Sequence, residues 1–388
     1  MLPTVPGYSE TFFRNKIRGL RDNGFEVILF VENKAINNED LDCDVVVAPN
    51  FRVHKMKGFL TVIFTILKCI VFYPKSSLKH LRLDKEDGFS FPNRIKRLVL
   101  NQFLFRYKLK WLHFGFGMQA IDRENVASAI GAQMAVSFRG ADLYLSPIKH
   151  PGCYDLLFTK NIQYHVLSEE MKQDLNNYGV QLDHIHVITP AINTEFFKAT
   201  VASRKANEPL QLITVARLHW KKGIIYTLEA LSHLRRDSID FKYTIIGDGE
   251  EIERIKFAIY QLDLQDHVIL AGKCSQEEVR RRLESSDIYL QYSIQEGFCN
   301  AALEAQSMGL MTIVSNAEGL TENVQHMRSG WVVPKRQPKQ LAQKIVEVMK
   351  LPDSEKDDIR HFAMKRVKDE FNLRKQNREF KQFYLSVD

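Results

Sequence analysis

The sequence has few cysteines, the residues that cross-link secreted domains and often ligate structural metals. Its cysteines are odd in number and none stands in a C-x-x-C pair: Cys43, Cys69, Cys153, Cys274 and Cys299. This pattern argues against a disulfide framework and a zinc site, and it predicts a reducing, cytoplasmic compartment. The histidines show no metal-ligand spacing, so no metal site is expected.

The chain also lacks a recognisable signal peptide and a bilayer-spanning run. The opening MLPTVPGYSETFF has no basic start followed by an apolar core. The longest apolar run, 58–73, is interrupted by Lys68 and is shorter than the about 20 residues that a spanning helix needs. We favour a helix buried against a sheet for this run. The alternative is an interfacial membrane helix, because cations flank the run: Lys55, Lys57, Lys75, Lys79 and Arg82.

Positive charge is concentrated in one block. Residues 51–110 contain 14 Lys and Arg and three Asp and Glu, an excess of 11 positive charges in a chain whose net charge is +7. Such a block indicates an anionic partner, either nucleic acid or a lipid surface, or it is a solvated helical face. No helix-turn-helix, zinc-finger or aromatic RNA-binding motif accompanies it, so we expect no nucleic-acid partner.

The length of 388 residues predicts two domains. In 1–197, predicted strands alternate with helices in the rhythm of a parallel sheet, but only Met1 and Leu2 stand where its first strand is expected. Either that strand is cut short or the start of the chain is incomplete. The polar stretch 198–209 is interpreted as a linker, and the rhythm restarts within 198–369. A final helix at 351–384 is long enough to return, so we assign about 370–388 to the first domain.

The stretch 288–304, IYLQYSIQEGFCNAALE, predicts a strand, a loop and a helix that begins near Cys299. Glu296 precedes the helix and Glu304 lies inside it. Because a helix start favours an anion, we expect a phosphate there, with a carboxylate on each side to hold hydroxyls. Arg217 and Lys222, in the loop TVARLHWKKG (214–223), could stabilise a leaving diphosphate without a metal. The pattern indicates a nucleotide-sugar site.

The second half resembles the retaining GT-B glycosyltransferases of the large Glu-x7-Glu family (group 1, or family 4, type). The matching pieces occur in the family's order: VARLHWKKG (215–223), YTIIGDGEE (243–251), HVILAGK (267–273), SSDIYLQYS (285–293), EGFCNAALEAQSMGL (296–310) and EGLTENV (318–324). The first half matches more loosely, at GYSETF (7–12), HFG (113–115), SFRGAD (137–142) and TPAINTEFF (189–197). The resemblance implies an α/β fold of two Rossmann-like domains facing across a cleft, with the C-terminal helix returning to the first domain.

The resemblance implies a role for each matching position in the second domain. Glu296 would contact donor-sugar hydroxyls near the reacting carbon, and Glu304 would bind the ribose hydroxyls. Arg217 and Lys222 would hold the diphosphate. Backbone groups would supply the remaining contacts: those of Phe298, Cys299 and Asn300 over the phosphate, and those of Gly272, Lys273 and Cys274 near the base.

The resemblance also implies roles in the first domain. His113 would face the sugar or the acceptor, and Gly7 would let the backbone approach the site. The family's His-Gly-x-x-Asp is Arg139-Gly-Ala-Asp142 in this chain, which leaves the role of Arg139 open. Structural alternatives also stay open: a hydrogen-bonded core histidine at His113, a core ion pair for Glu304, and loop tethers at Asp142 and Glu322.

The resemblance implies transfer from a nucleotide-diphosphate sugar, with no cofactor, to a glycan or lipid-linked acceptor in cell-surface polysaccharide assembly. An anionic membrane surface at the inner face is a further expected partner. Three rivals stand beside this expectation. Asp42-Cys43-Asp44 offers the motif of a metal-dependent GT-A enzyme, but it precedes its strand. Gly247-Asp-Gly249 suggests a dinucleotide oxidoreductase, but Ile252 replaces the third glycine. A non-catalytic membrane-surface or anion-binding module using 51–110 is the third.

Overall fold

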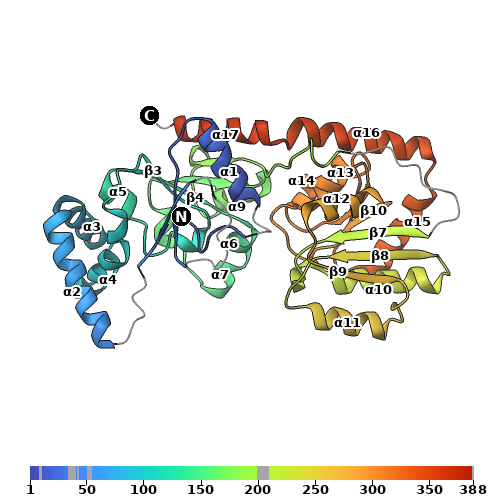
Figure 1. Cartoon of the computed structure of the whole chain (residues 1–388), viewed down its shortest axis with the longest axis horizontal. Helices are drawn as coiled ribbons and strands as arrows, with labels where there is room; N and C mark the ends of the chain where they lie inside the picture. The colour runs from blue at the N-terminus through green and yellow to red at the C-terminus, as the bar shows by residue number, and fades with distance from the viewer. Residues whose placement is uncertain (8–10, 34–40, 42, 50–54, 199–208, 387–388) are drawn as a thin grey trace. The chain divides into compact units, whose positions relative to one another are not determined.

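The computed structural model describes residues 1–7, 11–33, 41, 43–49, 55–198 and 209–386, with the backbone alone at 55–61. These residues form two compact units, Met1–Ile188 with Asn377–Asp388, and Thr189–Gln376 (Figure 1). Parallel strands form the sheets of both units. Ser9, Glu10, Asp42 and residues 199–208 of the predicted linker lie outside the described residues.

The two units divide after Ile188, earlier than the predicted boundary after residue 197. Residues 189–197 belong to the second unit because Ile192 and Phe197 are buried in its core. The Ile192 N–H donates to the Phe371 carbonyl at 2.9 Å. The Phe197 carbonyl accepts from Ser307 Oγ at 2.5 Å.

The predicted helix 351–384 is two helices, α16 (Asp353–Glu370) and α17 (Leu373–Leu385). The interruption is at Phe371, whose backbone leaves the helical conformation and whose side chain is buried in the second unit's core. Residues from 377 onward group with the first unit, where Phe380, Phe383 and Tyr384 pack against α1 (Thr11–Asp22). The prediction of a single helix was therefore wrong, because a core side chain interrupts it.

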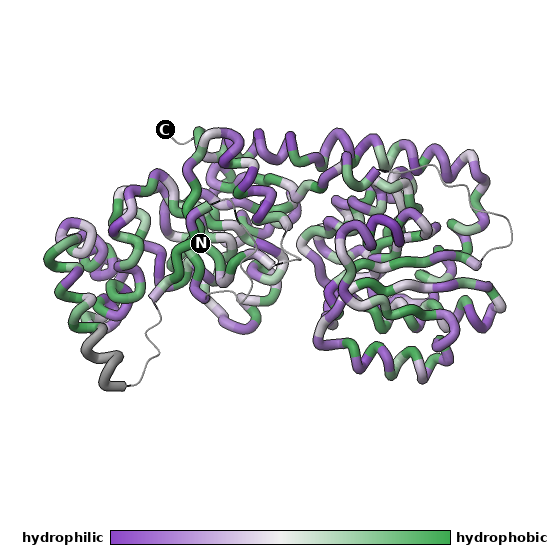
Figure 2. The backbone as a smooth tube through the Cα atoms, viewed as in Figure 1, coloured by the Kyte–Doolittle hydropathy of each residue, from purple (hydrophilic) through white to green (hydrophobic). Residues whose placement is uncertain are grey.

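The helical insert after β2 differs from the favoured prediction. α2 (Lys55–Phe72), α3 (Pro74–Glu86) and α4 (Phe91–Asn101) pack on one another, and the described part of α2 is coloured largely hydrophobic in Figure 2. Thr65 and Cys69 are the buried α2 side chains, whereas most of its large apolar side chains are exposed. The prediction that this helix is buried against a sheet was therefore wrong. Within the described residues, no helix has an apolar stretch that could cross a bilayer.

The first unit contains two groups of parallel strands. β1 (Ile28–Val31) pairs with β2 (Asp44–Val47), and a second sheet has the order β3-β4-β5-β6. Leu2 forms a parallel bridge to Val31, and the Met1 carbonyl accepts from Gly115 N–H at 2.9 Å. Met1 and Leu2 thus occupy the place of the expected first strand. The remaining elements are β3 (Trp111–Phe114), β4 (Gln133–Ser137), β5 (Gln163–Val166), β6 (Ile185–Val187), α5 (Val126–Ile130), α6 (Gly140–Tyr144), α7 (Ser146–Lys149), α8 (Asp155–Phe158) and α9 (Glu169–Asn177).

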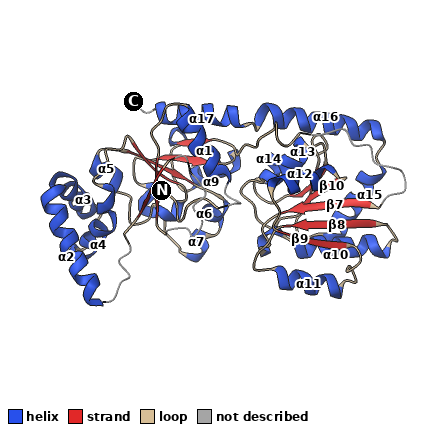
Figure 3. Ribbon diagram, viewed as in Figure 1, coloured by secondary structure: helices blue, strands red, loops and turns tan. Residues whose placement is uncertain are grey.

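The second unit is built on a six-stranded parallel sheet with the order β12-β11-β10-β7-β8-β9 (Figure 3). Its strands are β7 (Leu210–Val215), β8 (Phe241–Ile246), β9 (Val268–Gly272), β10 (Ile288–Gln291), β11 (Met311–Ser315) and β12 (Trp331–Val333). Its remaining helices are α10 (Ile224–Arg236), α11 (Ile252–Gln261), α12 (Gln276–Glu284), α13 (Asn300–Ser307), α14 (Leu320–Asn323) and α15 (Pro338–Lys350).

Both faces of this sheet are covered. Leu210 and Leu212 of β7 join a core cluster with α10, α11 and α15, whereas Ile213 joins a second cluster with α12, α13 and α16. Successive side chains of a strand point to opposite faces, and a parallel sheet buried on both faces therefore needs apolar residues in succession. The mostly apolar run LQLITV meets this need, and β7 lies between β10 and β8 inside the sheet.

Candidate functional site

The two halves of the second sheet meet between β7 and β10. β8 and β9 extend from one side of β7, and β11 and β12 extend beyond β10. In an open α/β sheet, the loops at the carboxyl ends of the strands at such a reversal form the ligand site. The loops here are 216–223 and 292–299, and they contain Arg217, Lys222 and Glu296.

Close backbone contacts hold these loops together. Gly223 has φ +64°, and a Cβ at this position would lie 2.0 Å from the Tyr292 carbonyl oxygen. The Lys221 carbonyl accepts from the Ile294 N–H at 2.7 Å. Gly319, after β11, has φ +75°, and a Cβ there would lie 2.1 Å from the carbonyl oxygen of residue 297. Glycine alone combines the left-handed conformation with the necessary space, so the three loops are fixed as a set.

Lys222 and Glu296 form an ion pair between Nζ and Oε2. Their side chains are 14% and 9% exposed. Ser293 Oγ donates to the same carboxylate at 3.3 Å and accepts from Gln291 Nε2 at 2.8 Å. Burial is the largest single influence on Lys222 and acts to lower its pKa, but the charge and hydrogen bond of Glu296, together with nearby Cys299, outweigh burial and the pKa is raised. Lys222 therefore stays charged at neutral pH, and the carboxylate of Glu296 is held in one orientation.

The loop after β7 carries more positive charge than the sequence analysis assigned. Arg217 is exposed. Lys221, which precedes Lys222 in the sequence, is half-buried. Burial is the main cause that lowers the pKa of Lys221. The charges of Lys222 and Arg217 also lower this pKa, and the charge of Glu296 acts in the opposite direction. Three cations thus accompany one carboxylate, as expected of a diphosphate site. The consecutive lysines at 221 and 222 were the signal for the missed residue.

The start of α13 is capped by a residue that the sequence analysis missed. Asn323, at the end of α14, accepts from the Cys299 N–H at 2.9 Å and donates to the Cys299 carbonyl at 3.1 Å. The Cys299 N–H is thus engaged, whereas within the described residues the N–H groups of Phe298 and Asn300 make no hydrogen bond. Burial raises the pKa of the Cys299 thiol to about 11, which excludes a thiolate at neutral pH.

Glu304 lies in the second turn of α13 and has a different environment from Glu296. Its side chain is half-buried, and no cation or hydrogen-bond donor in the described part of the chain pairs with its carboxyl group. Burial raises its pKa from an ordinary value of 4.5 to about 7. The alternative that Glu304 forms a core ion pair is therefore not supported, since no described residue is its partner. The Glu304 carboxyl group remains available to ligand hydroxyls.

Glu304→Gln should flatten part of the pH dependence of stability. Because the folded pKa is raised, the folded state binds this proton more tightly than the unfolded state. The associated stabilisation is complete below pH 4.5 and is lost as the pH rises through about 7, with an upper bound of about 3 kcal/mol. Denaturant unfolding at pH 5 and pH 8 should therefore show a larger loss for the wild type than for the variant. Equal losses would contradict the shift.

Two comparisons identify the family to which the chain belongs. The family model of glycosyl transferases group 1 matches residues 196–366, which include both loops and α13. The amylovoran biosynthesis glycosyltransferase AmsK of Erwinia amylovora is 31% identical over 271 residues, 67% of this chain and 66% of that protein. The chain belongs to the group 1 glycosyltransferases. This membership makes the protein an enzyme. The alternative of a non-catalytic membrane-surface or anion-binding module was therefore wrong.

Two further comparisons cover nearly the whole length of this group 1 glycosyltransferase. The putative colanic acid biosynthesis glycosyltransferase WcaL of Escherichia coli (strain K12) is 27% identical, and the match covers 96% of each chain. The crystal structure of Anabaena Alr3699/HepE in complex with UDP and glucose superposes with a TM-score of 0.71 at 14% identity, covering 100% of this chain and 99% of that one. The predicted GT-B fold of two Rossmann-like domains is confirmed.

The residues predicted near the base lie at the end of β9 in this glycosyltransferase. The Gly272 carbonyl accepts from the Gly247 N–H at 2.8 Å, which joins the loops after β8 and β9. Lys273 Nζ lies 3.7 Å from the exposed Asp248 carboxylate. Cys274 is buried. The base contact of Gly272, Lys273 and Cys274 stays a prediction.

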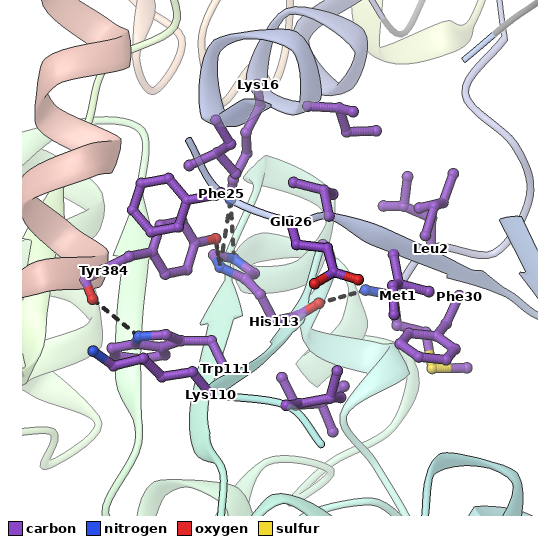
Figure 4. Close-up of a pocket in the computed structure, with 18 of the residues that line it drawn as sticks. Met1, Leu2, Lys16, Phe25, Glu26, Phe30, Lys110, Trp111, His113 and Tyr384 are labelled. Atoms are coloured by element: carbon purple, nitrogen blue, oxygen red, sulfur yellow. Dashed lines mark hydrogen bonds between the residues drawn. The ribbon is translucent and has the colours of Figure 1, made fainter. Parts of the chain in front are cut away.

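His113, in β3 of the first unit, is tied into an internal chain of hydrogen bonds. Its Nδ1 lies 2.6 Å from the Tyr384 hydroxyl, which Figure 4 shows directed at the imidazole. Its Nε2 lies 2.7 Å from Ser137 Oγ, which is 2.8 Å from His165 Nδ1. His165 Nε2 lies 3.0 Å from the Ile188 carbonyl. Both nitrogens of His113 are thus engaged internally, which favours the alternative of a core histidine over a contact with sugar.

A cavity of about 450 Å³ lies beside His113 and is lined by residues of β1 and β3 (Figure 4). Lys16 Nζ lies 3.4 Å from both ring nitrogens of His113 and 4.2 Å from the Phe380 ring centroid. Burial, followed by the charge of Lys16, lowers the pKa of the Met1 ammonium to about 5. The cavity lies where Met1 and Leu2 occupy the place of the expected first strand.

The remaining first-unit predictions have separate outcomes. Gly7 is exposed and its role stays a prediction. The Arg139 guanidinium lies 4.1 Å and 4.6 Å from the ring centroids of Phe12 and Phe13, so it packs on aromatic faces of α1. Asp142 accepts from the backbone N–H groups of Arg139 at 3.2 Å and Met118 at 3.4 Å, as a loop tether does.

The carbonyl of Glu322 accepts from Arg366 Nη2 at 2.7 Å, so its backbone also tethers a loop. In the described part of the chain, no group of three or more His, Cys, Asp or Glu side chains is arranged to hold a metal ion.

Proposed function

We propose that this protein is a retaining, metal-independent glycosyltransferase that moves a sugar from a nucleotide-diphosphate donor to a hydroxyl of a glycan or lipid-linked acceptor. The observation that carries the proposal is the contrast between its two carboxylates. Glu296 is held in an ion pair with Lys222, whereas Glu304 has no protein partner among the described residues. The first suits donor-sugar hydroxyls near the reacting carbon, and the second suits the ribose hydroxyls.

The positive charge after β7 supplies the electrostatic part of the mechanism. As the bond between the anomeric carbon and the phosphate oxygen breaks, negative charge develops on the diphosphate. Arg217, Lys221 and Lys222 stabilise that charge, and the N–H groups of Phe298 and Asn300 at the start of α13 add hydrogen bonds. No step in this scheme requires a metal.

The retaining outcome is carried over from the resemblance to the Glu-x7-Glu family, and the environment of Glu296 bears on how that outcome is reached. A double displacement would use a carboxylate as nucleophile at the anomeric carbon, but Glu296 is neutralised by Lys222 and accepts from Ser293. We therefore propose attack on the same face as departure. The acceptor oxygen bonds to the anomeric carbon as the phosphate leaves, and the departing phosphate takes the proton of the acceptor hydroxyl.

The names of the relatives support an assembly role. AmsK is named for amylovoran biosynthesis and WcaL for colanic acid biosynthesis. We propose that this chain acts in cell-surface polysaccharide assembly at the cytoplasmic face of a membrane. UDP-sugars are the first donors to test, because the HepE complex contains UDP.

A screen of UDP-, GDP- and ADP-sugars by thermal shift tests the proposal. The correct donor at about a hundred times its Kd should stabilise the protein by about 2.7 kcal/mol, which corresponds to roughly 5 to 10 °C in Tm. The shift should persist in EDTA, and NMR of the transfer product should show the anomeric configuration of the donor.

A matched comparison sharpens the screen. Glu304→Gln should lose most of the donor-induced shift, whereas Glu347→Gln, on the exposed face of α15, should keep it. A shift that requires a divalent cation would overturn metal independence. An inverted anomer would overturn the retaining mechanism.

A further inference from the structure

The described part of α2 has its apolar face outward. Phe64, Leu67 and Val71 recur at helical spacing and are 71%, 55% and 67% exposed. Ile63, Ile70 and Phe72 widen the same exposed surface. The helix instead buries Thr65 and Cys69 against the insert. Large apolar side chains gathered in this way on a folded unit mark an interaction surface. We call these six residues the α2 face: Ile63, Phe64, Leu67, Ile70, Val71 and Phe72.

Three lysines accompany the α2 face. Lys68 lies within the face, and Lys75 and Lys79 lie at the start of α3. None of these three side chains forms an ion pair with another described residue. The nearby carboxylates are neutralised by other partners. Asp84 is buried against Arg97 at 3.1 Å, Glu86 pairs with Arg82 at 2.9 Å, and Asp87 pairs with Lys160 at 2.5 Å.

The helices α3 and α4, on which α2 packs, are held by buried polar contacts. Arg97 of α4 bonds Glu124 at 2.7 Å and Asp122 at 3.0 Å as well as Asp84. Asn125 Nδ2 donates to the other oxygen of Asp84 at 2.8 Å, and Ser77 Oγ donates to the Cys69 carbonyl at 3.2 Å. This largely buried network of ion pairs and hydrogen bonds fixes α3 and α4 against the unit, and α2 packs on both helices, so its apolar residues are presented on a rigid base.

We propose that the α2 face binds the surface of a bilayer that contains anionic lipid, with α2 lying in the plane of the interface. The apolar side chains enter the boundary between head groups and acyl chains, and Lys68, Lys75 and Lys79 meet the lipid phosphates. A second copy of this chain fits less well, because a self-complementary contact would bring these cations together without counter-charges. The inference is independent of the donor site, since it concerns adsorption and not transfer.

Sedimentation of the full chain with vesicles tests this inference. Wild type should pellet with vesicles of phosphatidylcholine and phosphatidylglycerol and much less with phosphatidylcholine alone, and salt should weaken the binding. Lys68→Gln/Lys75→Gln/Lys79→Gln should reduce the affinity by about a hundredfold, since each cation near an anionic surface contributes about fivefold. Phe64→Asn/Leu67→Asn/Val71→Asn should abolish binding to the same vesicles.

The second unit provides matched controls. Phe257 and Tyr260 of α11 are 59% and 67% exposed, so Phe257→Asn/Tyr260→Asn removes comparable apolar surface and should leave binding unchanged. Lys339→Gln/Lys350→Gln/Lys365→Gln removes three exposed cations and should also have little effect. Wild type that stays in the supernatant, or equal losses in the controls, would overturn the proposal. So would wild type that is dimeric by light scattering and becomes monomeric in the Asn variant, because a second copy would then occupy the face.

Discussion

Glu296→Gln should lower the rate of sugar transfer by about 10²- to 10³-fold, the range lost when one preorganised electrostatic group is removed from an active site. The amide keeps the shape of the side chain but removes the negative charge that fixes Lys222. Under the proposed roles, the substitution removes the carboxylate that accepts hydrogen bonds from donor-sugar hydroxyls, and it also disturbs the position of the lysine that holds the diphosphate. Initial rates with the donor found by thermal shift provide the measurement.

A second buried pair provides the control for Glu296. Glu124 and Arg97 in the first unit lie 2.7 Å apart and are as well buried as the pair at the site. Glu124→Gln should destabilise the protein but leave the transfer rate of the folded fraction near that of wild type. Full activity in Glu296→Gln would remove Glu296 from the site.

Lys222→Met should reduce both donor affinity and turnover, with a combined loss of about 10²-fold or more in kcat/KM. The thioether fills similar space but leaves the buried Glu296 without its partner, and under the proposed role it also removes one cation from the diphosphate. Breaking a buried pair from one side costs about 3 to 5 kcal/mol, so stability should also fall. Isothermal titration with the donor and denaturant unfolding measure the two effects separately.

The double variant Lys222→Met/Glu296→Gln separates stability from function. It contains no lone buried charge, so it should recover much of the unfolding free energy that Lys222→Met loses. Its transfer activity should nevertheless remain as low as that of the single variants. Donor affinity that is unchanged in Lys222→Met would count against a diphosphate contact.

The second unit was the more predictable part of the chain, because its signals are local. The run LQLITV, the glycines that end the loops and the spacing of Glu296 and Glu304 all lie within short stretches. The parallel pairing of its strands follows from the alternation of strands and helices. The cap on Cys299 was not predictable in this way, because its partner Asn323 is 24 positions away and acts through a side-chain amide.

The first unit was harder to predict, since its decisive contacts are distant in sequence. The neighbours of His113 include Tyr384, 271 positions away, and no local pattern reveals that hydrogen bond. The apolar run at 58–73 predicted a helix but not its orientation. An apolar helix is usually buried, whereas here Thr65 and Cys69 face the insert and Phe64 faces outward. Hydrophobicity alone does not distinguish a core from an interaction surface.

The interlocked loops also constrain how the sugar specificity of this enzyme could be redesigned. Residue 223 is pressed against the carbonyl of Tyr292, and residue 319 against the carbonyl of residue 297. A single loop grafted from a relative would meet a backbone shaped for a different neighbour, and any side chain at either glycine would collide with it. The loops after β7, β10 and β11 therefore form one transplantable module, and a new specificity is best introduced by exchanging all three together.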